Sequence, residues 1–144
     1  MRHRIRGRKL NRSTAHRKAL LRNLARSLFI EFGRNNHIIT TREKAKFAQP
    51  FAEKLITLAK EKTLHNYRRG LQLLQDEDLV HKLFEEIGPA YKERPGGYTR
   101  ILGLQKRRLG DQASQVMFGF VPDGESAPVA AAVAEGADEA ASEE

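Results

Sequence analysis

Residues 13–33 read STAHRKALLRNLARSLFIEFG, and this stretch decides the fold because its apolar side chains follow helical spacing. They recur three and four positions apart, which places them on one face of a helix. The set consists of Leu20, Leu21, Leu24, Ala25, Leu28, Phe29 and Phe32. Ser13 is a residue type that caps helix starts, and Gly33 is the type that commonly ends a helix. The stretch therefore predicts a core-facing helix.

The other side of this helix is basic. Lys18, Arg22 and Arg26 lie four positions apart, so we expect them to form a row of cations on the solvent side. Before the helix, residues 1–12 alternate Arg with small or polar residues and have little to bury. This composition predicts an arm that is disordered in the free protein.

Residues 1–22 hold nine Lys and Arg and no Asp or Glu. Each guanidinium is permanently charged and offers a planar fork that fits phosphate oxygens, so the arm predicts phosphate binding driven by counterion release. The alternative is a solvated charged tail, but solubility alone would not require Arg without acids. Interleaved polar residues could contact sugar or base groups. They are His3, Asn11, Ser13, Thr14 and His16.

Downstream of the first helix, residues 37–41 are short and β-branched, as in a strand. Thr40 and Glu43 have the spacing of a capping box, which predicts that a second helix starts here and runs to about Lys60. Pro50 removes one hydrogen bond from that helix and should kink it, and a complete break at Pro50 is the alternative.

Two short helices should follow, at about residues 64–74 and 77–87, the second capped by Asp76 and stopped by Gly88 and Pro89. Residues 98–104 and 115–121 have the length and apolar content of strands, and we expect them to pair as a hairpin. The linker between them should be a basic exposed loop containing Lys106, Arg107 and Arg108. Tyr98 and Arg100 would lie near it, with Tyr98 either stacking on a base or packing in the core.

The 144 residues suffice for one compact domain with tails. There is no Cys, which excludes disulfides and thiolate metal sites. The start lacks the apolar segment of a secretory signal, and no run of 18 apolar residues occurs, so we expect a cytoplasmic protein that does not span a membrane. Residues 122–144 form an acidic, Ala-rich tail that should be disordered.

Charge points to a polyanionic partner. The net charge is +8, but the tail holds seven acidic and no basic groups, which leaves 26 basic against 11 acidic groups in the rest. An excess of that size repels itself unless a polyanion neutralises it, and nucleic acid is the leading candidate. A membrane surface would favour a basic amphipathic helix with Trp or Phe on its apolar face, which the arm lacks.

Catalytic patterns are hard to find. The five His residues have no metal-ligand spacing, and no motif of a zinc protease, nucleotide-binding loop or nucleophile elbow occurs. A nuclease could use the acidic groups at 76–78 and 85–86 around Mg²⁺, but the first group lies at a helix start, where the dipole favours negative charge. We therefore expect no catalytic residues, cofactor, metal or small-molecule substrate.

Several motifs resemble one family, the bacterial large-subunit ribosomal protein numbered seventeen (bL-seventeen). The matching stretches are residues 1–4, 7–12, 16–17, 22–23, 55–60, 83–84 and 96–101. The match spans about residues 1–121, with these stretches in the right order, and the acidic tail lies beyond it. The resemblance implies an α+β fold of two layers, with about four helices packed on a small three-stranded sheet.

The resemblance also implies a non-enzymatic protein of the large ribosomal subunit that binds 23S ribosomal RNA, with neighbouring proteins near the peptide exit region. Expected RNA contacts carried over from the family are Arg2, His3, Arg4, Arg6, Arg8, Lys9, Arg12, Arg17, Arg22 and Arg100. The residues themselves add His16, Lys18, Arg26, Tyr98, Lys106, Arg107 and Arg108. We divide the chain into an RNA-binding arm (1–12), one α+β domain (13–121) and the tail (122–144). The alternative function is a nucleoid or regulatory DNA-binding protein.

Overall fold

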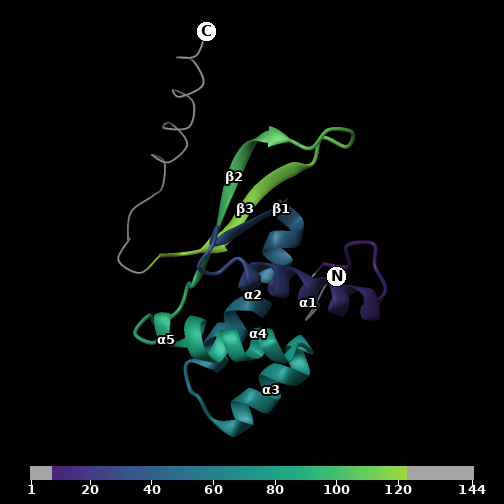
Figure 1. Cartoon of the computed structure of the whole chain (residues 1–144). Coiled ribbons are helices and arrows are strands. Elements are labelled where there is room, and N and C mark those ends of the chain that lie inside the picture. The colour runs from purple at the N-terminus through teal and green to yellow at the C-terminus, as the bar shows by residue number, and fades with distance from the viewer. Residues whose placement is uncertain (1–7, 123–144) are drawn as a thin grey trace, which may run out of the picture.

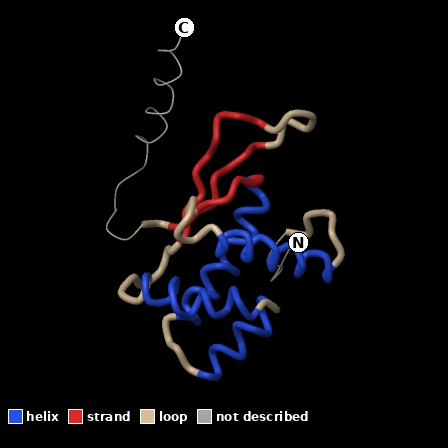
Figure 2. The backbone as a smooth tube through the Cα atoms, in the orientation of Figure 1, coloured by secondary structure: helices blue, strands red, loops and turns tan. Residues whose placement is uncertain are grey.

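A computed structural model describes residues 8–122, which form a layer of helices on one face of a small antiparallel sheet (Figure 1; Figure 2). The elements are α1 (Thr14–Ile30), β1 (His37–Thr41), α2 (Arg42–Ala59), α3 (Leu64–Leu74), α4 (Glu77–Lys82), the π-helical turn η1 (Leu83–Ile87), α5 (Gly88–Ala90), β2 (Thr99–Arg107) and β3 (Ser114–Phe120). Since α4, η1 and α5 follow one another without a gap, they form a fourth helical segment. The expected α+β fold of two layers is confirmed.

Helix α1 matches its prediction closely. The Ser13 hydroxyl accepts a hydrogen bond from the backbone N–H of His16 at 3.5 Å, and Ala25, Leu28 and Phe29 are fully buried. Beyond the helix, Gly33 adopts a φ of +81°, a left-handed conformation that glycine tolerates without strain. The local cap and the apolar spacing therefore define this helix.

The predicted capping box at the start of α2 is wrong. Thr41, not Thr40, is the N-cap residue, and its side chain makes no capping hydrogen bond. Thr40 instead belongs to β1, where it pairs with Val116 of β3. Sheet pairing has therefore overridden the local capping signal.

Pro50 does not break α2, so the alternative of two separate helices is wrong. The helix continues from Arg42 to Ala59 with Pro50 inside it. Pro50 and Lys46, one turn before it, are both exposed, so water can bond the carbonyl group that loses its N–H partner.

The fourth helical segment starts where expected but ends later. The Asp76 carboxylate accepts from the backbone N–H of Leu79 at 3.2 Å, which confirms the predicted cap. Gly88 does not stop the helix; it lies against α2, where an added Cβ would come within 2.4 Å of the carbonyl oxygen of Ala59. Gly88 therefore marks a close helix contact. Pro89 is the second residue of α5, and because it has no backbone N–H it donates no hydrogen bond to the preceding turn.

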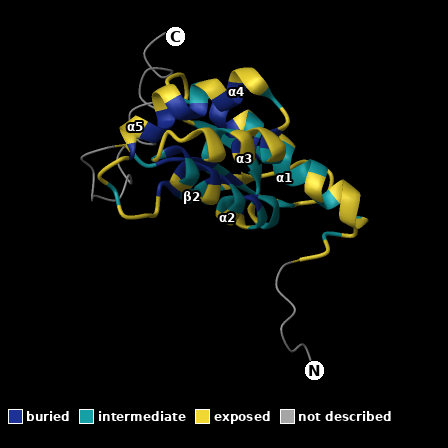
Figure 3. Ribbon diagram, turned by 90° about the horizontal axis from the view of Figure 1, so that it is seen from below, coloured by how far each residue is buried: buried dark blue, intermediate teal, exposed yellow. Residues whose placement is uncertain are grey.

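The sheet has the strand order β1-β3-β2, with both neighbours of β3 antiparallel to it. The predicted hairpin of β2 and β3 is confirmed, but β2 extends to Arg107, so Lys106 and Arg107 lie on the strand and not in the linker. On β3, Val116, Phe118 and Phe120 alternate toward the helices and are buried. The core lies between this face and the helical layer (Figure 3).

Candidate nucleic-acid interface

The described end of the arm is a turn held against α1. The backbone N–H of Arg12 donates to the carbonyl oxygen of Lys9 at 3.0 Å, and Leu10 and Asn11 between them have positive φ. Arg17 then donates from Nη1 to the carbonyl oxygen of Arg12 at 2.7 Å. Arg17, a predicted RNA contact, therefore anchors the arm to α1.

The arm also contacts the start of α2. Arg8 forms an ion pair with Glu43, and Arg12 lies within hydrogen-bond reach of the His16 ring, while Lys9 is exposed. In residues 8–12 the structure has a hydrogen-bonded turn where disorder was expected. The other expected contacts in the arm, and the disorder expected for residues 1–7, lie outside the described part of the chain. These contacts are Arg2, His3, Arg4 and Arg6.

The predicted row of cations on the solvent side of α1 is incomplete, because two of its members bond to the end of α3. Arg22 donates from Nε to the carbonyl oxygen of Leu73 at 3.1 Å. Arg26 donates from Nε to the carbonyl oxygen of Leu74 at 3.0 Å, and its Nε lies 3.7 Å from a carboxylate oxygen of Asp76. Cations at a helix C-terminus bond to free carbonyl groups and compensate the negative end of the helix dipole. Of the predicted row, only Lys18 is exposed.

The start of α2 carries cations that the sequence analysis missed. Arg42 and Lys46 are exposed and Lys44 is half-buried, all within the first five residues of the helix. The N-terminus of a helix disfavours positive charge because of its dipole. This conflict with a local rule was the signal available in the sequence, since such conflicts concentrate at functional sites.

The β2–β3 hairpin presents exposed cations at the end of β2 and in the turn that follows it. Lys106 and Arg107 are exposed, and Arg108 donates from Nε to a carboxylate oxygen of Asp111 at 2.9 Å. The Arg108 hydrogen bond, with one from the backbone N–H of Ala113, lowers the pKa of Asp111 to about 2. Arg108 is therefore partly neutralised, and Lys106 and Arg107 are the free charges at this end of the hairpin.

Tyr98 packs in the core, which is the second of the two alternatives that the sequence left open. Its side chain is buried, and its ring packs on Tyr91 with the ring centroids 5.6 Å apart. Its hydroxyl accepts from the Thr57 hydroxyl at 3.4 Å. Arg100 is half-buried and lines a hollow of about 450 Å³, together with Met117 of the sheet and with Phe32 and Tyr91, which follow α1 and α5.

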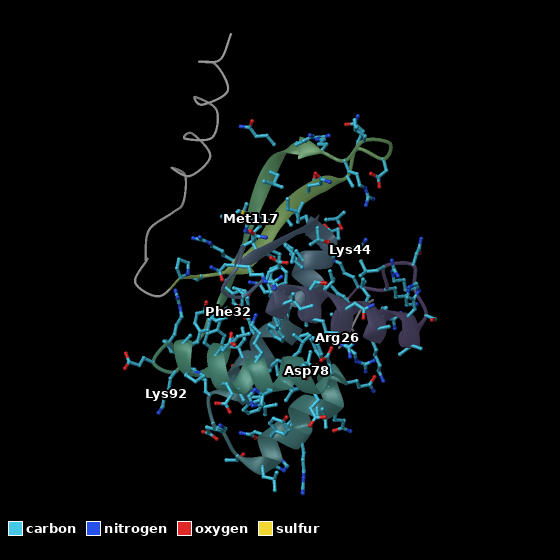
Figure 4. All side chains as sticks on the ribbon, in the orientation of Figure 1. Arg26, Phe32, Lys44, Asp78, Lys92 and Met117 are labelled. Carbon is cyan, nitrogen blue, oxygen red and sulfur yellow. The ribbon has the colours of Figure 1, made fainter. Side chains whose placement is uncertain are left out.

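The exposed cations of the arm, α2 and the hairpin lie on neighbouring elements. In Figure 4, Lys44 at the start of α2 lies between the hairpin and α1, whereas Lys92, after α5, lies at the opposite end of the view. The Arg8–Glu43 ion pair joins the arm to α2, and β1 leads from the sheet directly into α2. We give the name basic surface to nine exposed or half-buried cations of the arm, α1, the start of α2 and the end of β2. Its described members are Arg8, Lys9, Arg12, Lys18, Arg42, Lys44, Lys46, Lys106 and Arg107.

Two of the carboxylates considered for a nuclease form hydrogen bonds and ion pairs within the protein. Asp76 caps α4 and faces Arg26, while Glu85 accepts a hydrogen bond from Lys62, which lowers the pKa of Glu85. Among residues 8–122, no group of three or more His, Asp or Glu side chains could hold a metal ion. These contacts give both carboxylates a structural role.

Within the described residues, no helix has the length and apolar character needed to cross a membrane. The model of the family "Ribosomal protein L17" matches residues 20–121. The chain is also similar to "Large ribosomal subunit protein bL17" of Carboxydothermus hydrogenoformans, with 54% identity over 109 residues, covering 76% of this chain and 93% of the relative. A protein of the same name from a Sulfurihydrogenibium species is 46% identical over 121 residues, covering 84% and 97%.

Proposed function

Since the chain belongs to the ribosomal protein L17 family, and is therefore a non-enzymatic structural constituent of the large ribosomal subunit, we propose that it binds and stabilises 23S ribosomal RNA through its basic surface and arm. The arm and the basic surface take up phosphate groups, and the helical layer holds them in position. Neighbouring large-subunit proteins near the peptide exit region are its further expected partners, on the strength of the family resemblance.

The observation that carries this proposal is the contrast between two groups of cations. Arg22 and Arg26 are bonded to backbone carbonyl groups, whereas Lys9, Lys18 and Lys106 are exposed and have no ion pair with any described residue. Exposed cations without counter-charges raise the free energy of the free protein, and phosphate groups remove that cost on binding. DNA offers phosphates too, but membership of a large-subunit family favours RNA.

The test removes charges from the basic surface and measures binding to 23S ribosomal RNA over a series of salt concentrations. The double variant Lys106→Gln/Arg107→Gln and the single variant Lys18→Gln should weaken binding, and each lost phosphate contact should reduce the slope of log affinity against log salt by about 0.7 to 0.9. Lys92→Gln is the matched control, because Lys92 is exposed and lies away from the basic surface (Figure 4).

Deletion of residues 2–12 tests the arm in the same assay, and binding to duplex DNA of equal charge tests the alternative function. We expect the deletion to lower affinity for the RNA and the intact protein to prefer 23S RNA over the duplex. Equal losses from Lys92→Gln and Lys18→Gln would contradict the assignment of a basic surface. A preference for the duplex would favour the DNA-binding alternative.

A further inference from the structure

Helix α3 carries a second group of cations, away from the basic surface. His65, Arg68, Arg69 and Gln72 are spaced i, i+3, i+4 and i+7, so they share one stripe of the helix, and all four are exposed. Together they line one shallow hollow. We call these four residues the α3 stripe.

The opposite side of α3 explains why the stripe faces outward. Tyr67, Gly70 and Leu74 face the protein: the Tyr67 ring lies 5.5 Å from that of Phe84, and a Cβ at Gly70 would come within 3.2 Å of the same ring. Leu74 is fully buried. Because this packing fixes the rotation of the helix, the α3 stripe cannot turn inward.

Both ends of α3 are also held. The Thr63 hydroxyl accepts from the backbone N–H of Asn66 at 3.2 Å, and Arg22 and Arg26 bond the carbonyl groups at the C-terminal end. The stripe is therefore presented on a rigid element. Rigid presentation reduces the ordering entropy that a binding partner must otherwise offset.

Within residues 8–122, the charges of the stripe have no paired counter-charges. Helix α3 contains no acidic residue, and neither Arg68 nor Arg69 makes a side-chain hydrogen bond or ion pair with any residue from 8 to 122. Glu61 lines a neighbouring hollow with Arg69, but Lys54 lines the same hollow, and no ion pair forms there. By contrast, Lys62, just before α3, is paired with Glu85.

We propose that the α3 stripe is a second RNA-binding site, in which Arg68 and Arg69 bind phosphate groups of a different RNA segment from the one held by the hairpin. This rests on the proposed function. Guanidinium groups bind phosphate through two parallel hydrogen bonds, and His65 and Gln72 add donors for phosphate or ribose oxygens.

The second site lies at the opposite end of the molecule from the hairpin, because α3 is located there. In Figure 1 the hairpin projects from one end of the molecule and α3 forms the other end, with the helical layer between them. We expect the cations at the two ends to contact different parts of the RNA. The protein therefore joins two RNA segments, with the hairpin on one and the α3 stripe on the other.

The experiment uses the full chain, 23S ribosomal RNA and chemical probing of the bound RNA. In the variant Arg68→Gln/Arg69→Gln, affinity should fall about tenfold or more at moderate salt, and the salt slope should fall by about 1.4 to 1.8 for two lost phosphate contacts. The variant Arg68→Lys/Arg69→Lys keeps the charges and should keep most of the slope. Arg34→Gln/Lys92→Gln is the matched control, because both residues are exposed and lie outside the stripe.

Chemical probing then separates the two sites. The nucleotides that lose protection in Arg68→Gln/Arg69→Gln should differ from those that lose protection in Lys106→Gln/Arg107→Gln, and the two losses in log affinity should add. If the same nucleotides are affected, or if the α3 variant binds RNA like the control, the proposal is overturned.

Two further outcomes distinguish the proposals from each other. An α3 variant that binds RNA normally but is lost from large subunits would mean that the stripe contacts a protein, and the second RNA site would be wrong. If neither the α3 variant, the hairpin variant nor the arm deletion changes RNA binding, the proposed function itself fails.

Discussion

The guanidinium of Arg22 in α1 donates from Nε to the carbonyl oxygen of Leu73 at the end of α3, at 3.1 Å and across 51 residues of sequence. Lys82 of α4 makes the corresponding contact with α1, donating to the carbonyl oxygens of Ile30 and Phe32 at 3.1 and 2.9 Å. These hydrogen bonds connect each helix to the C-terminal end of another helix. Arg22, which the sequence analysis predicts to contact RNA, therefore also stabilises the packing of the helices.

Arg26→Gln tests that structural role. The variant loses hydrogen bonds to the carbonyl groups of Leu74 and Gln75, so the free energy of unfolding should fall by about 1.5 to 3 kcal/mol. Urea unfolding followed by circular dichroism measures the change. Lys18→Gln on the same helix is the control and should leave stability almost unchanged. A larger loss of stability in the Lys18 variant would contradict the assignment.

Gly88→Ala should destabilise the protein by about 3 kcal/mol, because the added methyl group would strike the backbone carbonyl of Ala59, which cannot move aside easily. Thermal and urea unfolding give the difference. Gly103→Ala is the matched control, since a Cβ at Gly103 meets nothing within 4 Å. Equal stability of the two variants would show that Gly88 does not mark a close contact.

Tyr98→Phe separates a core role from a binding role. Because the hydroxyl contacts Thr57 through a long hydrogen bond and also lies near the Lys60 ammonium group, its loss should cost about 1 kcal/mol and leave RNA affinity unchanged. Tyr98→Ala leaves a cavity and should cost about 3 to 5 kcal/mol. A folded Tyr98→Phe variant with weakened RNA binding would argue for a direct contact.

Asp111 gives the hairpin turn a dependence on pH. Its pKa lies at about 2 in the folded protein, below the ordinary 3.8, so the Arg108–Asp111 contact is fully present above the ordinary pKa and is lost as the pH falls toward 2. NMR titration of the Asp111 carboxyl carbon should show the low midpoint. Replacing Arg108 with Gln should return the midpoint toward 3.8, and an unchanged midpoint would remove Arg108 as the cause.

Local signals in the sequence were sufficient for most of the secondary structure. The bounds of α3 and β1 were predicted closely, because caps, periodicity and β-branched runs act over a few neighbouring residues. The i, i+3, i+4, i+7 spacing of the α3 stripe can also be seen in the sequence. The packing of Tyr67, Gly70 and Leu74 against the protein, however, is needed to show that the stripe faces outward.

What the sequence could not predict depends on partners far along the chain. From the sequence, Arg22 is expected to face solvent, but in the structure it bonds to the carbonyl oxygen of Leu73. Likewise, Gly88 is expected to stop a helix, but in the structure it packs against Ala59. Thr40 was misassigned because its pairing with Val116 outweighed the capping signal. Tyr98 could not be assigned to the core or the surface without the positions of Tyr91 and Thr57.

The strand order has a consequence for how the chain folds as it is made. The central strand, β3, is the last described element, and its partners in β1 lie 74 to 82 residues earlier. During synthesis α1 and β1 are therefore complete long before β1 can pair, and contacts at such separations form slowly. The helices can pack first, and the sheet closes last. A nascent chain that stops after Arg107 and before Ser114 is left with two unpaired strands.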